Sequence, residues 1–226
     1  ATLADILYTL GEPLWRTNAL MGDGVRDIQI PQFTIPAGDE FDITVDCILY
    51  GDGTARALWG DVAGGQDRFG FEDDGATGRP QRVYAFVGGS KQVWPGSLAD
   101  IAVGQHFSLR WYSNRGAGLQ YLEVNGVSFG PVGLSASPVN IADIYAAPAT
   151  NKYTEALQNV TLENTTTGDY IQYKINEGAG LVVKAYDRAG DEIPASAGTI
   201  TPDADWQYLP GPTDATIQNF DESGWG

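Results

Sequence analysis

Residues 120–130, QYLEVNGVSFG, carry the clearest structural signal in this sequence. Polar and apolar side chains alternate as far as Val124, the alternation stops at Asn125-Gly126, and it begins again at Val127. An alternation with a period of two indicates a β-strand that buries one face. Asn-Gly favours a two-residue turn in which both residues take a positive φ. The stretch therefore predicts an antiparallel β-hairpin.

The same alternation recurs along most of the chain. In FDITVDCILY, residues 41–50, every second side chain from Phe41 to Leu49 is apolar, whereas Asp42, Thr44 and Asp46 fall on the opposite face. The apolar spacing of three and four that indicates a helix is not sustained anywhere. The sequence therefore predicts an all-β protein. Side chains that share strand parity form the predicted core: Phe41, Val45, Phe107, Leu109, Trp111, Leu122 and Val124.

A chain of 226 residues suits a single large β-domain, which we expect to span residues 18–208. Residues 1–17 form a separate N-terminal segment, whose apolar run fits one helical turn or an edge strand. Residues 209–226 are rich in Pro, Gly and Asp and are expected to form an extended tail. The tail keeps three large apolar side chains, which we expect to dock on the same sandwich or on an adjacent subunit: Ile217, Phe220 and Trp225.

Composition excludes several classes of function. The 29 acidic and 13 basic residues give a formal net charge of −16, which disfavours nucleic acid as a partner. No apolar run approaches the roughly 18 residues of a membrane span, so we expect no membrane insertion. Cys47 is the only cysteine and His106 the only histidine, which rules out an intramolecular disulfide, a cysteine-based zinc site and a multi-histidine metal site.

Three blocks resemble the concanavalin A-like, laminin-G-like superfamily. Residues 104–130, GQHFSLRWYSNRGAGLQYLEVNGVSFG, are similar to its central hairpin; residues 18–49 are similar to its entry strands; and residues 155–164, EALQNVTLEN, are similar to its returning strand. The resemblance covers roughly residues 18–175. It implies a jelly-roll β-sandwich of antiparallel strands.

A further block resembles the appendix that many bacteriophage structural proteins carry after this domain. Glu177-Gly178-Ala179-Gly180, Gly198-Thr199-Ile200 and Trp206 match its pattern. The resemblance implies a virion protein, such as a capsid decoration or tail-fibre module, whose partners are neighbouring virion subunits in a homo-oligomer and possible host-surface glycans. A secreted bacterial carbohydrate-binding module, with an extracellular location, is the alternative.

The enzymes of this superfamily carry a carboxylate motif of the form E-x-D-x-x-E, which would place an acid and a nucleophile on one strand face. The motif is absent from this sequence, and His106 has no recognisable partner motif. We therefore expect a non-catalytic protein. A glycoside hydrolase or polysaccharide lyase on the same fold is a further alternative.

Two sets of residues are candidate sites. Exposed aromatic rings stack on sugar rings, and the chain offers Trp59, Tyr84, Trp94, Tyr112 and Tyr121 on or beside the sandwich. The predicted ligand-binding residues are Trp94, Tyr84 and Trp59, of which Trp94, in the loop-like stretch KQVWPGS, is expected to be exposed. Calcium is the one possible cofactor, since the FEDDG stretch offers adjacent carboxylates at Glu72, Asp73 and Asp74.

Overall fold

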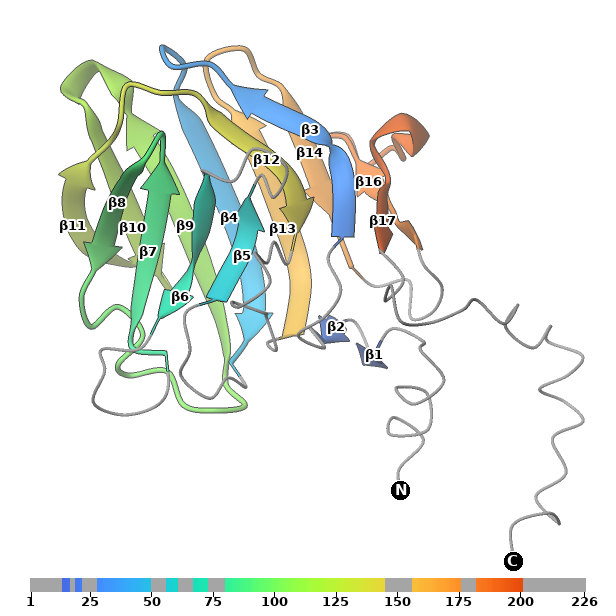
Figure 1. Cartoon of the computed structure of the whole chain (residues 1–226). Coiled ribbons are helices and arrows are strands. Elements are labelled where there is room, and N and C mark those ends of the chain that lie inside the picture. The colour runs from blue at the N-terminus through green and yellow to red at the C-terminus, as the bar shows by residue number, and fades with distance from the viewer. Residues whose placement is uncertain are drawn as a thin grey trace, which may run out of the picture.

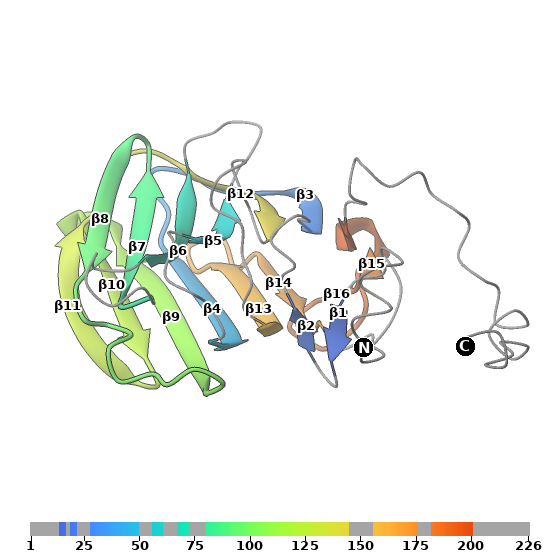
Figure 2. The ribbon, with the colours of Figure 1, turned by 60° about the horizontal axis from the view of Figure 1, so that its bottom comes forward.

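The computed structural model places two antiparallel sheets face to face (Figure 1). It describes residues 14–16, 19–21, 28–49, 56–60, 67–72, 80–144, 156–175 and 182–200. The tail 209–226, residues 1–13, Asp73 and Asp74 lie outside these ranges, so the predictions made for them stay predictions. Figure 2 shows the two layers from a second direction, with β3, β12, β5, β7 and β8 in one layer and β4, β9, β10, β11 and β13 in the other.

The first sheet has the order β1-β2-β13-β4-β9-β10-β11, and β14 and β16 extend it beside β13. All of its pairings are antiparallel. The described strands of this sheet are β1 (Leu14–Arg16), β2 (Ala19–Met21), β4 (Phe41–Ile48), β9 (His106–Asn114), β10 (Leu119–Val124), β11 (Val127–Gly133), β13 (Ala156–Asn164), β14 (Tyr170–Tyr173) and β16 (Ala185–Tyr186).

The second sheet has the order β15-β17-β3-β12-β5-β6-β7-β8 and is likewise antiparallel. Short 3-10 helices follow β9 and precede β17, at Arg115–Ala117 and Pro194–Ser196. The described strands of this sheet are β3 (Ile28–Ile35), β5 (Arg56–Gly60), β6 (Arg68–Glu72), β7 (Arg82–Val87), β8 (Ser90–Trp94), β12 (Val139–Ile144), β15 (Val182–Val183) and β17 (Gly198–Ile200).

The core lies between the sheets and contains every side chain predicted for it. All seven are buried: Phe41, Val45, Phe107, Leu109, Trp111, Leu122 and Val124. Trp111 and Phe41 meet edge to face at a centroid distance of 4.6 Å, an arrangement that suits the quadrupoles of aromatic rings. Cys47 is fully buried in β4. The all-β prediction and the predicted jelly-roll β-sandwich are therefore confirmed.

The hairpin that joins β10 to β11 also has the predicted turn. Asn125 has a φ of 50° and Gly126 a φ of 77°, the left-handed region that a tight turn of this kind requires at both positions. The Asn125 side chain accepts a hydrogen bond from the backbone N–H of Ser108 in β9. This contact fixes the hairpin against its neighbouring strand.

Residues 170–200 add strands to both sheets at one edge of the sandwich. Strands β14 and β16 extend the first sheet, whereas β17 pairs with β3 in the second. The Tyr173 hydroxyl donates to the Ser196 carbonyl at 3.0 Å. A Cβ on Gly198 would lie 2.7 Å from Cγ2 of Ile28, so the close approach of β17 to β3 requires a glycine.

At the other end of the chain, residues 14–16 form an edge strand that pairs with β2. This is one of the two structures expected for the N-terminal apolar run. Within the described ranges, no helix has both the length and the apolar character needed to span a membrane.

Candidate functional site

The three aromatic residues predicted to bind a ligand are all buried. The expected exposure of Trp94 is wrong, since only 2% of its surface is accessible. Trp94 is the last residue of β8, pairs with Val83, and donates its indole N–H to the Gly130 carbonyl of β11 at 3.2 Å. Strands β8 and β11 are edge strands of opposite sheets, so this hydrogen bond joins the two sheets at one edge of the sandwich.

Trp59 is 1% exposed and belongs to the core. Its ring stacks on Phe69 with a centroid distance of 4.4 Å and an interplanar angle of 4°, and Trp111 lies beyond at 6.2 Å. A register shift between Ala57 and Trp59 in the pairing of β5 with β6 changes the alternation at this point. Neither tryptophan offers a ring face to a saccharide.

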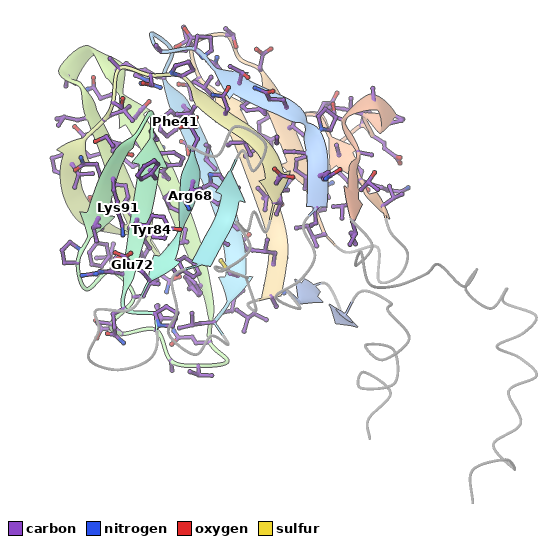
Figure 3. All side chains as sticks on the ribbon, viewed as in Figure 1. Phe41, Arg68, Glu72, Tyr84 and Lys91 are labelled. Atoms are coloured by element: carbon purple, nitrogen blue, oxygen red, sulfur yellow. The ribbon has the colours of Figure 1, made fainter. Side chains whose placement is uncertain are left out.

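Tyr84 and Glu72 lie together on the outer face of the second sheet, with Arg68 and Lys91 (Figure 3). Phe69 and Phe71 point into the core, which places Arg68 and Glu72 of the same strand on the outside. Nζ of Lys91 lies 5.0 Å from the centroid of the Tyr84 ring, which is 5% exposed. A cation therefore covers the ring that was expected to face a ligand.

Burial raises the pKa of Tyr84 to about 12. The nearby Arg68 guanidinium acts in the opposite direction, and Glu72 adds to the increase. The phenol consequently keeps its proton at neutral pH and can donate a hydrogen bond.

The carboxylate of Glu72 already has two cationic partners. Its Oε2 accepts a 2.5 Å hydrogen bond from Nζ of Lys91, and its Oε1 lies 2.9 Å from Nε of Arg82, an ion pair without the alignment of a hydrogen bond. This environment does not suit a calcium ligand, because two cations occupy the oxygens that the metal would need. Asp73 and Asp74 lie outside the described ranges, and among the residues inside them no group of three acidic, histidine or cysteine side chains is placed to hold a metal ion.

The outer face of the first sheet carries a different arrangement, which we call the tyrosine row. Strand register aligns Tyr121 with Tyr112, Tyr112 with Asp42, Asp42 with Glu163, and Glu163 with Tyr170. The row therefore crosses β10, β9, β4, β13 and β14 in order. With strands about 4.8 Å apart, four such steps span roughly 19 Å.

Two tyrosines at one end of the row form a partly exposed aromatic pair. The rings of Tyr112 and Tyr121 stack with a centroid distance of 5.0 Å and an interplanar angle of 10°. Pro131 of β11 pairs with Tyr121 on its other side and is exposed. These side chains form a continuous apolar and aromatic surface beside the carboxylates of the row.

An arginine joins a tyrosine to a carboxylate at each end of the row. Arg110 lies over Tyr112, with 4.5 Å between the guanidinium carbon and the ring centroid, and binds Asp42 through Nε and Nη2 at distances of 2.6–3.1 Å. The hydrogen bond with Asp42 raises the pKa of Arg110, so the guanidinium stays charged.

At the other end, Arg188 lies 4.7 Å from the centroid of Tyr170 and pairs with Glu163 at 2.8 Å. Amide side chains of β13 and β14 lie on the same face, further along these strands from the row. Nδ2 of Asn159 lies 3.4 Å from Oδ2 of Asp46, and Gln172 donates to Oδ1 of Asn159 at 3.0 Å. Rings, fixed carboxylates and amides together are the groups that carbohydrate sites use, since rings contact C–H faces and the polar groups bind hydroxyls.

Sequence reasoning included Tyr112 and Tyr121 among the aromatics but did not select them. Strand parity could have done so, because Trp111 points into the core and its neighbour Tyr112 must then point out. Asp42, Glu163 and Tyr170 could not be joined to them in the same way. Their alignment depends on pairings between strands that are distant in the sequence.

Comparison with known proteins gives no family. No family model matches the chain, and no curated protein is similar to it in sequence. Among solved structures, the fold is similar to that of a Bacteroides ovatus protein provisionally assigned as carbohydrate-binding, with a TM-score of 0.52 and 13% identity over 78% of this chain. The match spans 58% of the Bacteroides protein, and the likeness shows the fold alone.

Two further matches are more distant. A heptameric pentraxin from Limulus polyphemus has a TM-score of 0.45 and 11% identity, and the match covers 62% of this chain and 76% of the pentraxin. Sheep galectin-11 has a TM-score of 0.33 and 14% identity, and the match covers 53% of this chain and 95% of the galectin. The class that the fold defines is the jelly-roll β-sandwich of antiparallel strands.

Proposed function

We propose that this chain is a non-catalytic carbohydrate-binding protein whose tyrosine row holds a neutral saccharide. The observation that carries the proposal is the partly exposed Tyr112–Tyr121 stack beside a carboxylate that a bidentate arginine holds in place. The provisional assignment of the Bacteroides protein with the same fold is consistent with this function. The match spans 58% of that protein, so the activity of the whole Bacteroides protein is not assigned to this chain.

The row would divide recognition between its two kinds of side chain. Tyr121, at the end of the stack, offers the apolar surface on which the C–H face of a pyranose packs. Asp42 and Glu163, at the centre, accept hydrogen bonds from hydroxyl groups, and Arg110 keeps the Asp42 carboxylate oriented. Three carboxylates, those of Asp42, Glu123 and Glu163, share two arginines on this face, and the excess negative charge would repel an acidic sugar, which is why we propose a neutral one.

A neutral-glycan array followed by calorimetry tests this function. Tyr121→Ala should weaken binding of any glycan that wild type binds by about 1–2 kcal/mol, the scale of one lost aromatic contact. Tyr186→Ala is the matched control, because Tyr186 is also partly exposed, lies under a cation, Lys174, and belongs to the edge strand β16. Equal losses in both variants, or an array without any neutral glycan bound by wild type, would overturn the proposal.

We further propose that the protein works as a bacteriophage virion component, in a homo-oligomer with neighbouring virion subunits. The support is the resemblance of residues 169–206 to the appendix of phage structural proteins. Mass spectrometry of purified virions, compared with the secreted fraction of the same culture, tests this role. Occurrence of the chain in the secreted fraction alone would favour the secreted carbohydrate-binding module instead.

A further inference from the structure

The outer face of β6, β7 and β8 carries an excess of positive charge in a strongly acidic protein. Arg82 and Lys91 contact the single carboxylate of Glu72, and Arg68 lies on the same outer face of β6; we call these four residues the cation cluster. Three cations and one carboxylate leave a formal excess of two positive charges, whereas the whole chain carries −16. An acidic protein has no need of such a group for solubility, so the cluster requires another explanation.

Arg68 is the most informative member of the cluster. Its guanidinium lies over the ring of Phe86, 5.2 Å from the centroid. Within the described part of the chain, the Arg68 side chain has no hydrogen bond and no ion pair, and its Nε is buried without an acceptor. A guanidinium has five N–H donors in a planar fork that fits a carboxylate. The fork of Arg68 therefore lies against an aromatic ring and contacts no anion among the residues that the structure describes.

Strand register places the backbone of Lys91 on the far side of Phe86, and its Nζ extends over Tyr84 to Glu72. Arg68 pairs with Phe86, and Phe86 pairs with Lys91, so the three form one row across β6, β7 and β8. Lys91 and Arg82 share Glu72, and a single carboxylate neutralises only one of them. Both keep partly exposed side chains, which leaves them accessible to a ligand.

We propose that the cation cluster binds the carboxylate of an acidic saccharide, with Arg68 as its principal partner. The partly exposed ring of Phe86 beside the fork provides a surface for the sugar ring. A long polyanion would extend beyond the cluster into the field of a protein with a net charge of −16. A single carboxylate senses mainly the cluster, because charges beyond about 8–10 Å are screened at physiological salt. This site lies on the opposite sheet from the tyrosine row and does not depend on its function.

Calorimetry of the full chain with digalacturonate, a disaccharide of two uronates, is the direct test, with the corresponding neutral disaccharide and free acetate as separate titrations. We expect digalacturonate to bind more tightly than either. Arg68→Gln should weaken its binding at least about tenfold, as expected for the loss of a charged hydrogen-bond pair. Acetate that binds as tightly as digalacturonate would overturn the saccharide assignment.

Lys184→Gln provides the matched control, since it makes the same change in net charge at an exposed site on the C-terminal edge, paired with Glu192. It should change the affinity less than twofold. Equal losses in Arg68→Gln and Lys184→Gln would show a general charge effect and overturn the proposal. If Arg68→Gln does not fold, Lys91→Gln replaces it and should lower the affinity severalfold. Tyr121→Ala should leave digalacturonate binding unchanged, which separates this test from that of the tyrosine row.

Discussion

The two outer faces of the sandwich share one backbone architecture and differ in how their charges are paired. On the β4, β9 and β10 face, Arg110 contacts two carboxylates, those of Asp42 and Glu123. On the β6, β7 and β8 face, Glu72 contacts two cations and Arg68 contacts no carboxylate in the described part of the chain. The first face is therefore acidic with aromatic ends, and the second is basic.

This difference shows which residues of a jelly roll determine the chemistry of its outer faces. The inward-pointing residues of each strand form the shared core, and the fold tolerates many choices at the outward positions. In β6 the outward residues are Arg68, Gly70 and Glu72, whereas in β4 they include Asp42, Thr44 and Asp46. Ligand preference follows from those outward residues. Substitutions on either face, or in the core between the faces, test this difference.

The largest effect is expected from a charge in the shared core. Leu109 of β9 is buried between the sheets, so Leu109→Asp should unfold the protein, because an unpaired buried charge costs several kcal/mol against a typical stability of about 5–15 kcal/mol. Circular dichroism and thermal melting measure the loss. His106→Asp, an exposed change in the same strand, should melt close to wild type. A folded Leu109→Asp protein would contradict the assignment of the core face.

An alkaline titration distinguishes the basic face from the rest of the molecule. The pKa of Tyr84 is about 12 in the folded state against 10.0 as its ordinary value, so the folded state holds this proton more tightly. The contribution is fully present below pH 10 and is lost as the pH rises to 12, by about 2–3 kcal/mol. Tyr84→Phe should remove this part of the decline in unfolding free energy. If the unfolding free energies of wild type and Tyr84→Phe fall with the same slope between pH 10 and 12, the burial of the phenol is contradicted.

Replacing one glutamate on each face by glutamine tests whether the charges of the two faces are paired differently. Glu72→Gln leaves Arg82 and Lys91 close together without their carboxylate, and we expect it to lower the unfolding free energy by about 1–2 kcal/mol. Glu123→Gln weakens a 3.4 Å contact with Arg110 between partly exposed groups and should cost less than about 0.5 kcal/mol. Urea denaturation of both variants measures the difference. Equal costs would show that the two faces are not paired differently.

A smaller effect than that of Glu72→Gln is expected from Asp42→Asn. The Arg110–Asp42 pair has short, bidentate contacts, but both side chains are partly exposed, which limits its contribution to about 0.5–1 kcal/mol. The cost should decrease in 1 M salt, because screening weakens an exposed ion pair. A cost of several kcal/mol that does not depend on salt would contradict this description of the pair.

The sequence predicted most of the fold and little of the site, for a physical reason that particular residues illustrate. Leu109, Trp111 and Leu122 could be assigned to the core because alternation within one strand fixes which side chains share a face. The Asn125-Gly126 turn was equally local. The exposure predicted for Trp94 is wrong because Pro95-Gly96 indicates a loop, whereas KQVWPGS contains the end of β8, whose parity points the indole inward.

Both candidate sites depend on register between strands, which alternation alone does not contain. Asp42 meets Arg110 across 68 residues of sequence, and Lys91 meets Glu72 across 19. The Tyr112 and Tyr121 pair is accessible from the sequence, since both residues belong to one hairpin and the short turn between β9 and β10 sets its register. The unpaired state of Arg68 required the positions of all its neighbours.

If both proposals hold, the two outer faces bind different chemical classes of saccharide. Backbone amide NMR of the labelled full chain, titrated first with a neutral oligosaccharide that the array identifies and then with digalacturonate, tests this difference between the faces. We expect the neutral ligand to shift resonances of β4, β9 and β10, digalacturonate to shift those of β6, β7 and β8, and the two ligands to bind together. Both ligands shifting the same strands, or competing for one site, would contradict it.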